Sequence, residues 1–486
     1  MSLPSVSPRF RQSLTKIVAT VGPASRDEAT LTGLIESGVD VFRLNMAHGT
    51  RDEHGETLAR IRRASAAVGR PVGVLADLAG PKIRLGVLRQ DPLRCRAGDE
   101  LWFVRGESAA ADQLATNYGP LVDELTVGDR VLLSDGTVGL EVLEKRAGSA
   151  RCRVTDAGVV RSRQGINLPG VSLSAPSMTG ADRENALWAA RHSIDFVGLS
   201  FVRSPEAVHE LRTLLRDYGS QALVVAKIEK PEALARLDEI VSAAGAVMVA
   251  RGDLGVEVDV ADIAVVQKRI IRACRRHHKP VIVATQMLDS MQHSARPTRA
   301  EVSDVSNAIL DGADACMLSG ETAVGEFPRE TVRMMRRIML ATERLLADTL
   351  PVEEGSGVGG VLPITKAVVE GASEIARRLE ARLVVIATAS GATARVRAHR
   401  RDTIPTIGVS AREETLRRMC LLWGVTPVPG APVEDRARLR QFVDDWGRGQ
   451  GILNDGDKVV FVTGSEIVRH AHNLVVVYEV GDDGAA

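Results

Sequence analysis

The strongest constraint on this chain is its alternation of short apolar runs, rich in Val and Ile, with longer segments of helical period. This order is typical of parallel strands, because parallel neighbours need a long return connection that is usually a helix. Eight runs have the length of a buried strand: Lys16–Val21, Val39–Asn45, Val72–Asp77, Ile194–Ser200, Leu223–Ile228, Ala246–Ala250, Pro280–Ala284 and Ala313–Leu318. Eight strands with intervening helices predict an α/β fold, the (β/α)8 TIM barrel.

The chain has 486 residues, whereas single hydrophobic cores stop growing near ~250–300 residues, so further domains are expected. Short alternating strands with turn signals at Gly98 and Gly128 interrupt the third barrel unit and predict a small inserted all-β lid domain. A Gly-rich linker at Glu353–Gly360 precedes another alternation of strands and helices, which predicts a C-terminal α/β domain. The expected limits are 1–86 and 172–350 for the barrel, 87–171 for the lid and 351–486 for the last domain.

Charge and cysteine content restrict the partners and the compartment. Lys plus Arg and Asp plus Glu both number 62, so the zero net charge argues against nucleic acid or an anionic membrane as partner. No run approaches the ~18 apolar residues of a spanning helix. Five cysteines, too scattered for a zinc or redox site, predict buried free thiols in a reducing compartment. We therefore expect a cytoplasmic protein.

Active sites of such barrels form at the C-terminal ends of the strands. Six of the predicted strands end there in polar residues: Arg43 and Asn45; Asp77, followed by Lys82 and Arg84; Lys227 and Glu229; Arg251 to Asp253; Thr285 and Gln286; Ser319 to Glu321. One charged residue alone is better explained as a helix cap or a salt bridge. Together, the cations suit a phosphate and the carboxylates a divalent metal, so the expected reactant is a phosphorylated anion.

Glu229 and Asp253 follow neighbouring strands and are candidates for sharing one Mg²⁺, although they could also be ordinary acids of the rim. The segment Gly252–Gly255 predicts a tight turn whose backbone N–H groups face a carboxylate or phosphate. Two standard nucleotide motifs are missing, namely G-x-x-x-x-G-K-[ST] and a G-x-G-x-x-G that opens a helix after a strand. Any nucleotide must therefore be held in another way.

Seven motifs, in the right order, resemble pyruvate kinase. They are RLNMAHG at 43–49, GPKIR at 80–84, AKIEKPEAL at 226–234, VARGDLGVE at 249–257, ATQMLDSM at 284–291, RPTRAE at 296–301 and LSGETAVGEFP at 318–328. The resemblance extends from TKIVATVGPAS at 15–25 into the last domain. It implies transfer of a phosphoryl group from phosphoenolpyruvate to ADP, with ATP and pyruvate as products.

The resemblance also implies roles for residues at matching positions. Lys227 would neutralise the migrating phosphoryl group, and Glu229 and Asp253 would bind one Mg²⁺ while a second arrives with ADP. The other implied sets are Gly252, Asp253 and Thr285 for the substrate carboxylate; Arg43, Asn45 and Arg84 for the phosphate side; Pro23 and His48 for the base and ribose; and Thr285, Ser319 and Glu321 for enolate protonation. The lid would close on Mg-ADP and exclude water.

Three positions depart from the family pattern around a monovalent cation. Many members bind K⁺ with Asn, Ser, Asp and Thr where this chain has Asn45, Ala47, Asp77 and Leu78, and they have Glu in place of Lys82. The lysine ammonium would supply the missing charge, so we expect that K⁺ is not required. The alternative is that Lys82 only pairs with an outer carboxylate. Gln164, where a hinge lysine is frequent, predicts weaker contact with the nucleotide phosphates.

The last domain holds a candidate effector loop at Thr388–Thr393, which follows a strand and opens a helix, although a capped helix start explains it equally well. The segment Gly464–His470 lacks the residues that hold fructose bisphosphate in some members. The resemblance further implies a homotetramer. Two rival functions remain at this point: a Mg²⁺-dependent aldolase or lyase acting on pyruvate enolates, which needs no ADP, and a regulatory protein built on an inactive barrel, which would have lost Lys227, Glu229 or Asp253.

Overall fold

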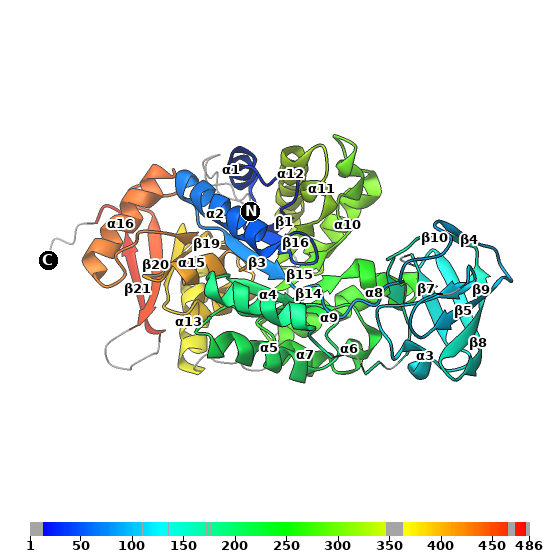
Figure 1. The fold of residues 1–486 in the computed structure, drawn as a ribbon. Coiled ribbons are helices and arrows are strands. Elements are labelled where there is room, and N and C mark those ends of the chain that lie inside the picture. The colour runs from blue at the N-terminus through cyan, green and yellow to red at the C-terminus, as the bar shows by residue number, and fades with distance from the viewer. Residues whose placement is uncertain are drawn as a thin grey trace.

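The structure is a computed structural model that describes residues 13–108, 110–134, 136–171, 173–174, 176–346, 363–464 and 472–482. Three expected features lie outside these described residues: the linker at Glu353–Gly360, the domain limit between residues 350 and 351, and residues 465–470 of the segment Gly464–His470. The barrel occupies the middle of the molecule, with the lid at one end and the C-terminal domain at the other (Figure 1). The domain limits given above stay predictions.

The prediction of a closed parallel barrel is confirmed. Its strands are β1 (Lys16–Thr20), β2 (Val41–Asn45), β3 (Gly73–Asp77), β12 (Phe196–Leu199), β13 (Leu223–Ile228), β14 (Ala246–Ala250), β15 (Val281–Ala284) and β16 (Ala315–Leu318). They pair in the order β1-β16-β15-β14-β13-β12-β3-β2. Each strand is mostly buried, which explains why these runs are almost purely apolar and do not alternate.

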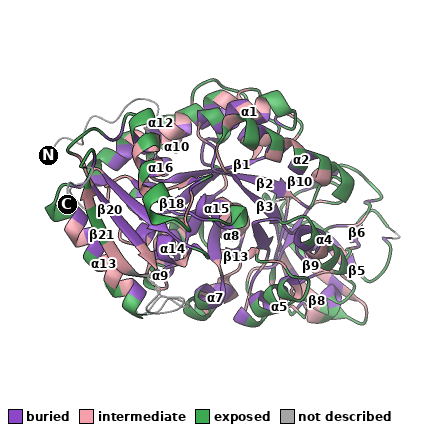
Figure 2. Cartoon of the chain, turned by 90° about the vertical axis from the view of Figure 1, so that its left-hand side faces the viewer, coloured by how far each residue is buried: buried purple, intermediate pink, exposed green. Residues whose placement is uncertain are grey.

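Helices surround the barrel and bury their inner faces against it, as the distribution of buried residues in Figure 2 shows. They are α1 (Glu28–Ser37), α2 (Arg51–Val68), α4 (Gly180–Arg191), α5 (Pro205–Asp217), α6 (Pro231–Ala235), α7 (Leu237–Ala243), α8 (Arg251–Glu257), α9 (Ile263–Arg276), α10 (Arg299–Leu310), α11 (Gly320–Ala323) and α12 (Pro328–Leu346). Capping boxes fix the starts of three of them, with Thr50, Thr179 and Thr298 as N-caps. The first residue of each of these helices is also the point at which the preceding loop ends, and such loops carry the site.

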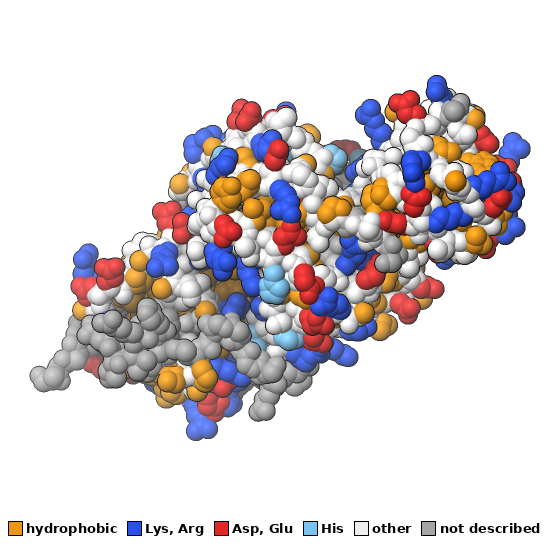
Figure 3. Space-filling model, turned by 60° about the horizontal axis from the view of Figure 1, so that its bottom comes forward, with side chains coloured by type: hydrophobic (Ala, Val, Ile, Leu, Met, Phe, Trp, Pro, Cys, Tyr) orange, Lys and Arg blue, Asp and Glu red, His pale blue; other side chains and the backbone are white. Residues whose placement is uncertain are grey.

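The lid is an all-β module with its own apolar core, which includes Phe103, Val131 and Leu140. Its strands are β4 (Leu93–Cys95), β5 (Glu100–Val104), β6 (Gln113–Leu114), β7 (Arg130–Leu133), β8 (Val138–Arg146), β9 (Ser149–Asp156), β10 (Gly158–Val160) and β11 (Ile166–Asn167), with one short helix, α3 (Leu121–Glu124). Six of these strands form a sheet in the order β11-β7-β8-β9-β5-β6, and β4 pairs with β10. On the face that Figure 3 shows, the lid is a separate lobe with basic and acidic side chains interspersed.

The C-terminal domain is a five-stranded sheet with helices. It contains α13 (Pro363–Arg378), β17 (Leu383–Ala387), α14 (Ala392–His399), β18 (Thr406–Val409), α15 (Glu413–Met419), β19 (Val425–Val428), α16 (Arg436–Gly449), β20 (Lys458–Gly464) and β21 (His472–Glu479). The strand order is β19-β18-β17-β20-β21, and β21 is antiparallel to β20.

This domain packs against the N-terminal ends of the barrel strands. Arg417 Nε lies 2.7 Å from Asp195 Oδ1, just before β12, and Lys16 Nζ at the start of β1 donates to the Val425 carbonyl at 2.9 Å. The C-terminal strand ends therefore face the opposite side, where the chain inserts the lid. All five cysteines are buried and free, as expected. Among the described helices, none combines the length and the apolar character needed to cross a membrane.

Candidate active site

Lys227 lies at the centre of a charged cluster at the C-terminal end of β13. Its Nζ is 3.0 Å from Glu229 Oε1 and 3.2 Å from Asp77 Oδ1, and it donates a hydrogen bond of 2.7 Å to Ser200 Oγ. Burial alone would lower the pKa of Lys227, but Asp77 and Glu229 more than offset it and raise the pKa. The ammonium group is therefore charged, although the side chain is only 11% exposed.

Asp77 holds two cations side by side. Arg43 Nε lies 2.7 Å from Asp77 Oδ2 and Lys227 contacts Oδ1. Burial would raise the pKa of Asp77, but the charges of Lys227 and Arg43 outweigh it and lower the pKa. The register of the barrel strands determines the position of this carboxylate. Asp77 pairs with Asn45 of β2 on one side and with Gly198 of β12 on the other. A Cβ atom at Gly198 would lie 2.7 Å from Asp77 Oδ1, so only glycine leaves room for the side chain.

Glu229 and Asp253 lie close enough to influence each other, as expected. Burial raises the pKa of Glu229; Lys227 opposes this effect and the charge of Asp253 adds to it. Glu229 is buried and its Oε2 accepts the backbone N–H of Phe201 at 2.7 Å. Its Oε1 contacts Lys227, and Asp253 Oδ1 contacts Lys82 Nζ at 3.0 Å. Each of the two carboxylates thus forms an ion pair with a lysine side chain.

The two carboxylates fit a divalent ion. Their oxygens are hard ligands, and a cation between them would relieve the repulsion that raises the pKa of Glu229. The described part of the chain contains no group of three or more His, Cys, Asp or Glu that could hold a metal. Mg²⁺ usually takes one or two carboxylates and completes its coordination shell with water and substrate oxygens.

The prediction of a tight turn at Gly252–Gly255 is wrong, because this segment belongs to helix α8, Arg251–Glu257. The strand β14 passes directly into the helix, so local helical hydrogen bonding replaces the expected turn. The backbone N–H of Gly252 at the first turn donates to Thr285 Oγ1 at 2.8 Å, and this hydroxyl donates to the Ala284 carbonyl at 2.6 Å. Gly252, Asp253 and Thr285 are thus neighbours, as the sequence predicted.

Glu321 and Ser319 form a buried pair after β16. The Glu321 carboxylate accepts the backbone N–H groups of Ser319 at 2.6 Å and of Leu288 at 3.2 Å. Burial raises the pKa of Glu321. Among the described residues, the Ser319 hydroxyl has no hydrogen-bond partner although it is buried. None of the described hydrogen bonds joins the Ser319 hydroxyl to Glu321, or either side chain to Thr285.

Of the residues expected on the nucleotide side, Arg43 contacts Asp77 of the Lys227 cluster, whereas none of the described contacts joins Arg84, Gln164, Pro23 or His48 to that cluster. Arg84 is exposed and donates to the Arg163 carbonyl at 3.3 Å, and Gln164 Nε2 donates to Ser134 Oγ at 3.0 Å within the lid. Pro23 and His48 are exposed at the barrel rim.

Lys82 contacts Asp253 rather than the expected potassium-site residues. None of the described contacts joins its ammonium group to Asn45, Asp77 or Leu78. The Asn45 side chain accepts the backbone N–H of Ala47 at 3.2 Å, and the Leu78 carbonyl accepts the Ser200 hydroxyl at 2.7 Å. The polar atoms that would surround a monovalent cation thus have partners within the chain.

Sequence reasoning gave no role to two residues that organise the site. The Ser200 hydroxyl accepts a hydrogen bond from Lys227 Nζ and donates one to the Leu78 carbonyl. Ser200 directly follows β12, so a search for polar residues at the C-terminal ends of the strands would have found it. Arg251 donates to the Thr285 carbonyl at 2.7 Å and lies 2.8 Å from Asp304. It supports the Thr285 backbone, whose φ of +71° is unfavourable for a β-branched residue.

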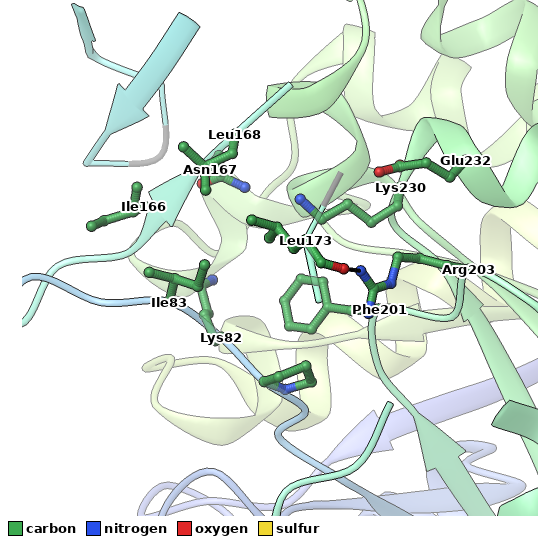
Figure 4. A pocket seen from close by; sticks show the side chains of 11 residues that line it. Lys82, Ile83, Ile166, Asn167, Leu168, Leu173, Phe201, Arg203, Lys230 and Glu232 are labelled. Carbon is green, nitrogen blue, oxygen red and sulfur yellow. Dashed lines mark hydrogen bonds between the residues drawn. The ribbon is translucent and has the colours of Figure 1, made fainter. Parts of the chain in front are cut away.

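A narrow crevice of about 30 Å³ separates the lid from the barrel next to Lys82. Its lining comes from both domains: Pro81, Lys82, Ile83, Ile166, Asn167, Leu168, Leu173, Phe201, Arg203, Lys230 and Glu232. Figure 4 shows the ammonium group of Lys230 reaching across it toward Asn167 of the lid. The crevice thus lies where strand β11 of the lid meets the loops that follow β3, β12 and β13 of the barrel.

Comparison with known proteins shows which family has this architecture. Residues 12–332 match the family described as pyruvate kinase, barrel domain, and residues 366–478 match pyruvate kinase, alpha/beta domain. The chain belongs to the pyruvate kinase family. Pyruvate kinases of Mycobacterium tuberculosis and Corynebacterium glutamicum are each 40% identical to it, over 96% of this chain and 98% of the relative. The pyruvate kinase of Geobacillus stearothermophilus is 39% identical over 96% of this chain and 80% of that protein.

The solved structures agree. A pyruvate kinase from Cryptosporidium parvum superposes with a TM-score of 0.89 at 31% identity, over 98% of both chains. The resemblance to pyruvate kinase seen in the motifs is therefore confirmed, and the chain is a phosphotransferase of the pyruvate kinase type. This result favours neither of the two rival functions, the Mg²⁺-dependent aldolase or lyase acting on pyruvate enolates and the regulatory protein on an inactive barrel.

Proposed function

We propose that this protein transfers the phosphoryl group of phosphoenolpyruvate to ADP, with Lys227 at the transferring group. The observation that carries the proposal is the contact of Lys227 Nζ with Glu229 and Asp77 at the C-terminal end of the barrel. A charged ammonium fixed at this point can neutralise the equatorial oxygens of a loose, metaphosphate-like transition state. Arg43, held by the same Asp77, would bind the phosphate from the other side.

Glu229 and Asp253 would hold a divalent ion, for which Mg²⁺ is the natural choice because it takes one or two carboxylates and fills its shell with water and substrate oxygens. When bound, the ion would supply Lewis-acid stabilisation of the enolate oxygen. The carboxylate of the substrate would be oriented beside Asp253 by the backbone N–H of Gly252 and the hydroxyl of Thr285. It would replace Thr285 Oγ1 and the Ala284 carbonyl as the acceptors of these two donors. A second Mg²⁺ would enter as part of the ADP complex.

The nucleotide would lie between lid and barrel. Arg84 and Gln164 on the lid side and Pro23, Asn45 and His48 on the barrel rim are the residues proposed to contact it. Closure of the lid would exclude water from the transferring phosphoryl group. Thr285, with Ser319 and Glu321 behind it, would then deliver a proton to the enolate carbon; the raised pKa of Glu321 makes this carboxyl a suitable proton store.

We also propose that catalysis does not require K⁺. Lys82 places a permanent positive charge at Asp253, and Asp77, which would otherwise face a monovalent cation, is already neutralised by Arg43 and Lys227. Ala47 offers no hydroxyl as a ligand, and the Leu78 carbonyl is bonded to Ser200. The charge that K⁺ would bring is thus supplied by side chains.

We further propose an effector site in the C-terminal domain and an oligomeric assembly. The loop Thr388–Thr393 would bind a sugar phosphate or nucleotide effector, supported by the left-handed Gly391 that precedes α14 and by a cavity of about 200 Å³ beside it, lined by Arg395 and Arg418. A homotetramer in the cytoplasm, without nucleic acid or membrane as partner, would fit the family, the zero net charge and the five free thiols.

A coupled lactate dehydrogenase assay tests the central assignment. Wild type should form pyruvate and ATP from phosphoenolpyruvate and ADP, and Lys227→Met should lower kcat by about 10³-fold or more with little change in KM. Lys145→Met, an exposed lysine of the lid, is the matched control and should keep wild-type turnover. Near-normal turnover of Lys227→Met would reject the role given to this residue.

A further inference from the structure

Glu257 joins the metal-bearing helix to the lid. The short helix α8 carries Asp253 in its first turn and Glu257 as its last residue. The Glu257 side chain is 1% exposed, and its Oε1 accepts hydrogen bonds from Lys230 Nζ at 2.5 Å and from Asn167 Nδ2 at 3.1 Å. Lys230 directly follows the proposed metal ligand Glu229, and Asn167 belongs to lid strand β11. One buried carboxylate thus links both metal-ligand segments with the lid.

The lid contacts α8 at a second point. A Cβ atom at Gly136 would lie 3.3 Å from Cγ1 of Val256, so the loop between β7 and β8 rests directly on the helix. Strand β11 pairs with β7 at Ile166 and Leu133. The two contacts therefore act on one rigid part of the lid, and α8 is the surface on which that part docks.

The same part of the lid carries the nucleotide-side residue Gln164. This side chain donates to Ser134 Oγ at 3.0 Å, so Gln164 is tied to the loop that touches α8. Any tilt of the lid at Asn167 would move Gln164 relative to Asp253 and Lys227. The orientation of the lid and the placement of the diphosphate are therefore coupled geometrically.

The cluster is poorly arranged for stability alone. Glu257 Oε2 and Asn167 Oδ1 are buried without a hydrogen-bond partner among the described residues. Burying an ion pair whose remaining acceptors are unsatisfied costs free energy, and apolar residues of the same volume would usually be tolerated as well or better. Figure 4 shows Lys230 and Asn167 facing each other across the crevice, which is the place where an opening lid would separate from the barrel.

We propose that Glu257 is a positioning residue: through Lys230 and Asn167 it fixes the angle at which the lid docks on α8, and so aligns ADP with the phosphoryl group. This inference rests on the proposed function, because it assumes that ADP binds between lid and barrel. Glu257 itself need not touch either substrate. A lid docked at the wrong angle would admit water and hold the diphosphate out of line.

The variant Asn167→Leu tests the link most cleanly, because it removes the lid side of the hydrogen bond and leaves the Lys230–Glu257 pair intact. We expect KM for ADP to rise about 10-fold and kcat to fall, with KM for phosphoenolpyruvate unchanged. We also expect slow release of inorganic phosphate from phosphoenolpyruvate, in which water takes the phosphoryl group in place of ADP and pyruvate is the other product. Glu257→Gln should reproduce these effects, and the double variant should be no worse than the more impaired single one.

A second measurement reports lid orientation without catalysis. Cysteines introduced at the exposed positions Glu107 on the lid and Asp217 on the barrel can carry spin labels, since the five native thiols are buried. Asn167→Leu should broaden the distribution of distances between the labels. Glu141→Gln is the matched control: it removes an ion pair with Arg153 that lies wholly within the lid, and it should change neither the kinetics nor the distances.

The outcomes separate this inference from the proposed function. If wild type forms no ATP from phosphoenolpyruvate and ADP, the proposed function fails. If wild type is active but Asn167→Leu keeps the wild-type KM for ADP, releases no phosphate and shows unchanged label distances, only the positioning role is overturned. A lower melting temperature with unchanged kinetics would likewise show that the cluster is purely structural.

Discussion

Lys82 Nζ lies 3.0 Å from Asp253 Oδ1, so an ammonium group contacts one of the two carboxylates proposed to hold the metal. Lys82 follows β3 and Asp253 lies in α8 after β14, so the pair spans the mouth of the barrel. The two side chains are 27% and 30% exposed, which leaves both accessible to substrate. Lysine at this position brings into the site a positive charge that needs no dissociable ion.

This contact predicts activity in the absence of potassium. In a buffer whose only monovalent cation is tetramethylammonium, wild type should retain its turnover, because the charge near the phosphoryl group is covalently attached. Lys82→Gln should lower turnover by about 10-fold or more, and added K⁺ should restore part of it. Strict dependence of wild type on K⁺ would show that Lys82 serves only as a partner of Asp253.

Removing one carboxylate should weaken metal binding. Asp253→Asn leaves Glu229 as the single charged ligand, so we expect the Mg²⁺ concentration for half-maximal activity to rise about 10-fold or more. Titration of the substrate-free protein with Mn²⁺, followed by electron paramagnetic resonance, measures the same loss without turnover. Asp217→Asn, which removes an exposed carboxylate at the end of α5, is the control and should bind Mn²⁺ normally. Equal Mn²⁺ affinity in Asp253→Asn and wild type would contradict the assignment.

A methyl group at Gly198 should disturb Asp77. The added Cβ would lie 2.7 Å from Asp77 Oδ1, and this carboxylate cannot yield freely because Arg43 and Lys227 hold it. We expect Gly198→Ala to lose about 1–3 kcal/mol of stability and at least 10-fold in kcat. Gly371→Ala, whose Cβ would meet nothing within 4 Å in helix α13, should be neutral or slightly stabilising. Full activity of Gly198→Ala would mean that the site tolerates a displaced Asp77.

Glu343 should make the stability of the protein depend on pH. Burial raises the pKa of this carboxyl from 4.5 to about 7, in spite of the backbone N–H groups of Thr15 and Leu14 that bond to it. Because the folded state holds the proton more tightly, this contribution is fully present below pH 4.5 and is lost as pH rises through 7. The shift corresponds to about 3 kcal/mol.

Comparison with Glu343→Gln isolates this contribution, since the amide does not titrate. Denaturant unfolding at pH 5 and pH 8 should show wild type losing stability relative to the variant as pH rises. The site at the other end of the barrel should be unaffected, so activity at pH 7 serves as the check on folding. A stability difference that is the same at both pH values would contradict the raised pKa.

Much of the fold could be predicted because each barrel strand is a short apolar run with helical segments around it, and this pattern has few solutions. The location of barrel active sites at the C-terminal ends of the strands also predicted correctly that Lys227, Glu229, Asp77 and Thr285 lie at one rim. The tight turn expected at Gly252 was wrong, since glycines there lie in the first turns of α8 and local sequence does not distinguish the two. The partner of Lys82 could not be predicted, because Asp253 lies 171 residues away along the chain.

The amino-acid sequence by itself determined the order of the strands and helices, the protein family and the chemical types of the residues at the C-terminal rim of the barrel. Periodicity and composition suffice for these features because they depend on local burial. Only the tertiary structure decided which charges meet: Lys227 with Asp77 and Glu229, Lys82 with Asp253, and Glu257 with Lys230 and Asn167. Except for Lys227 with Glu229, which are two residues apart, these contacts join segments that are separate along the chain. The strength of all of them depends on separations and burial that exist only once the barrel has closed and the lid has docked.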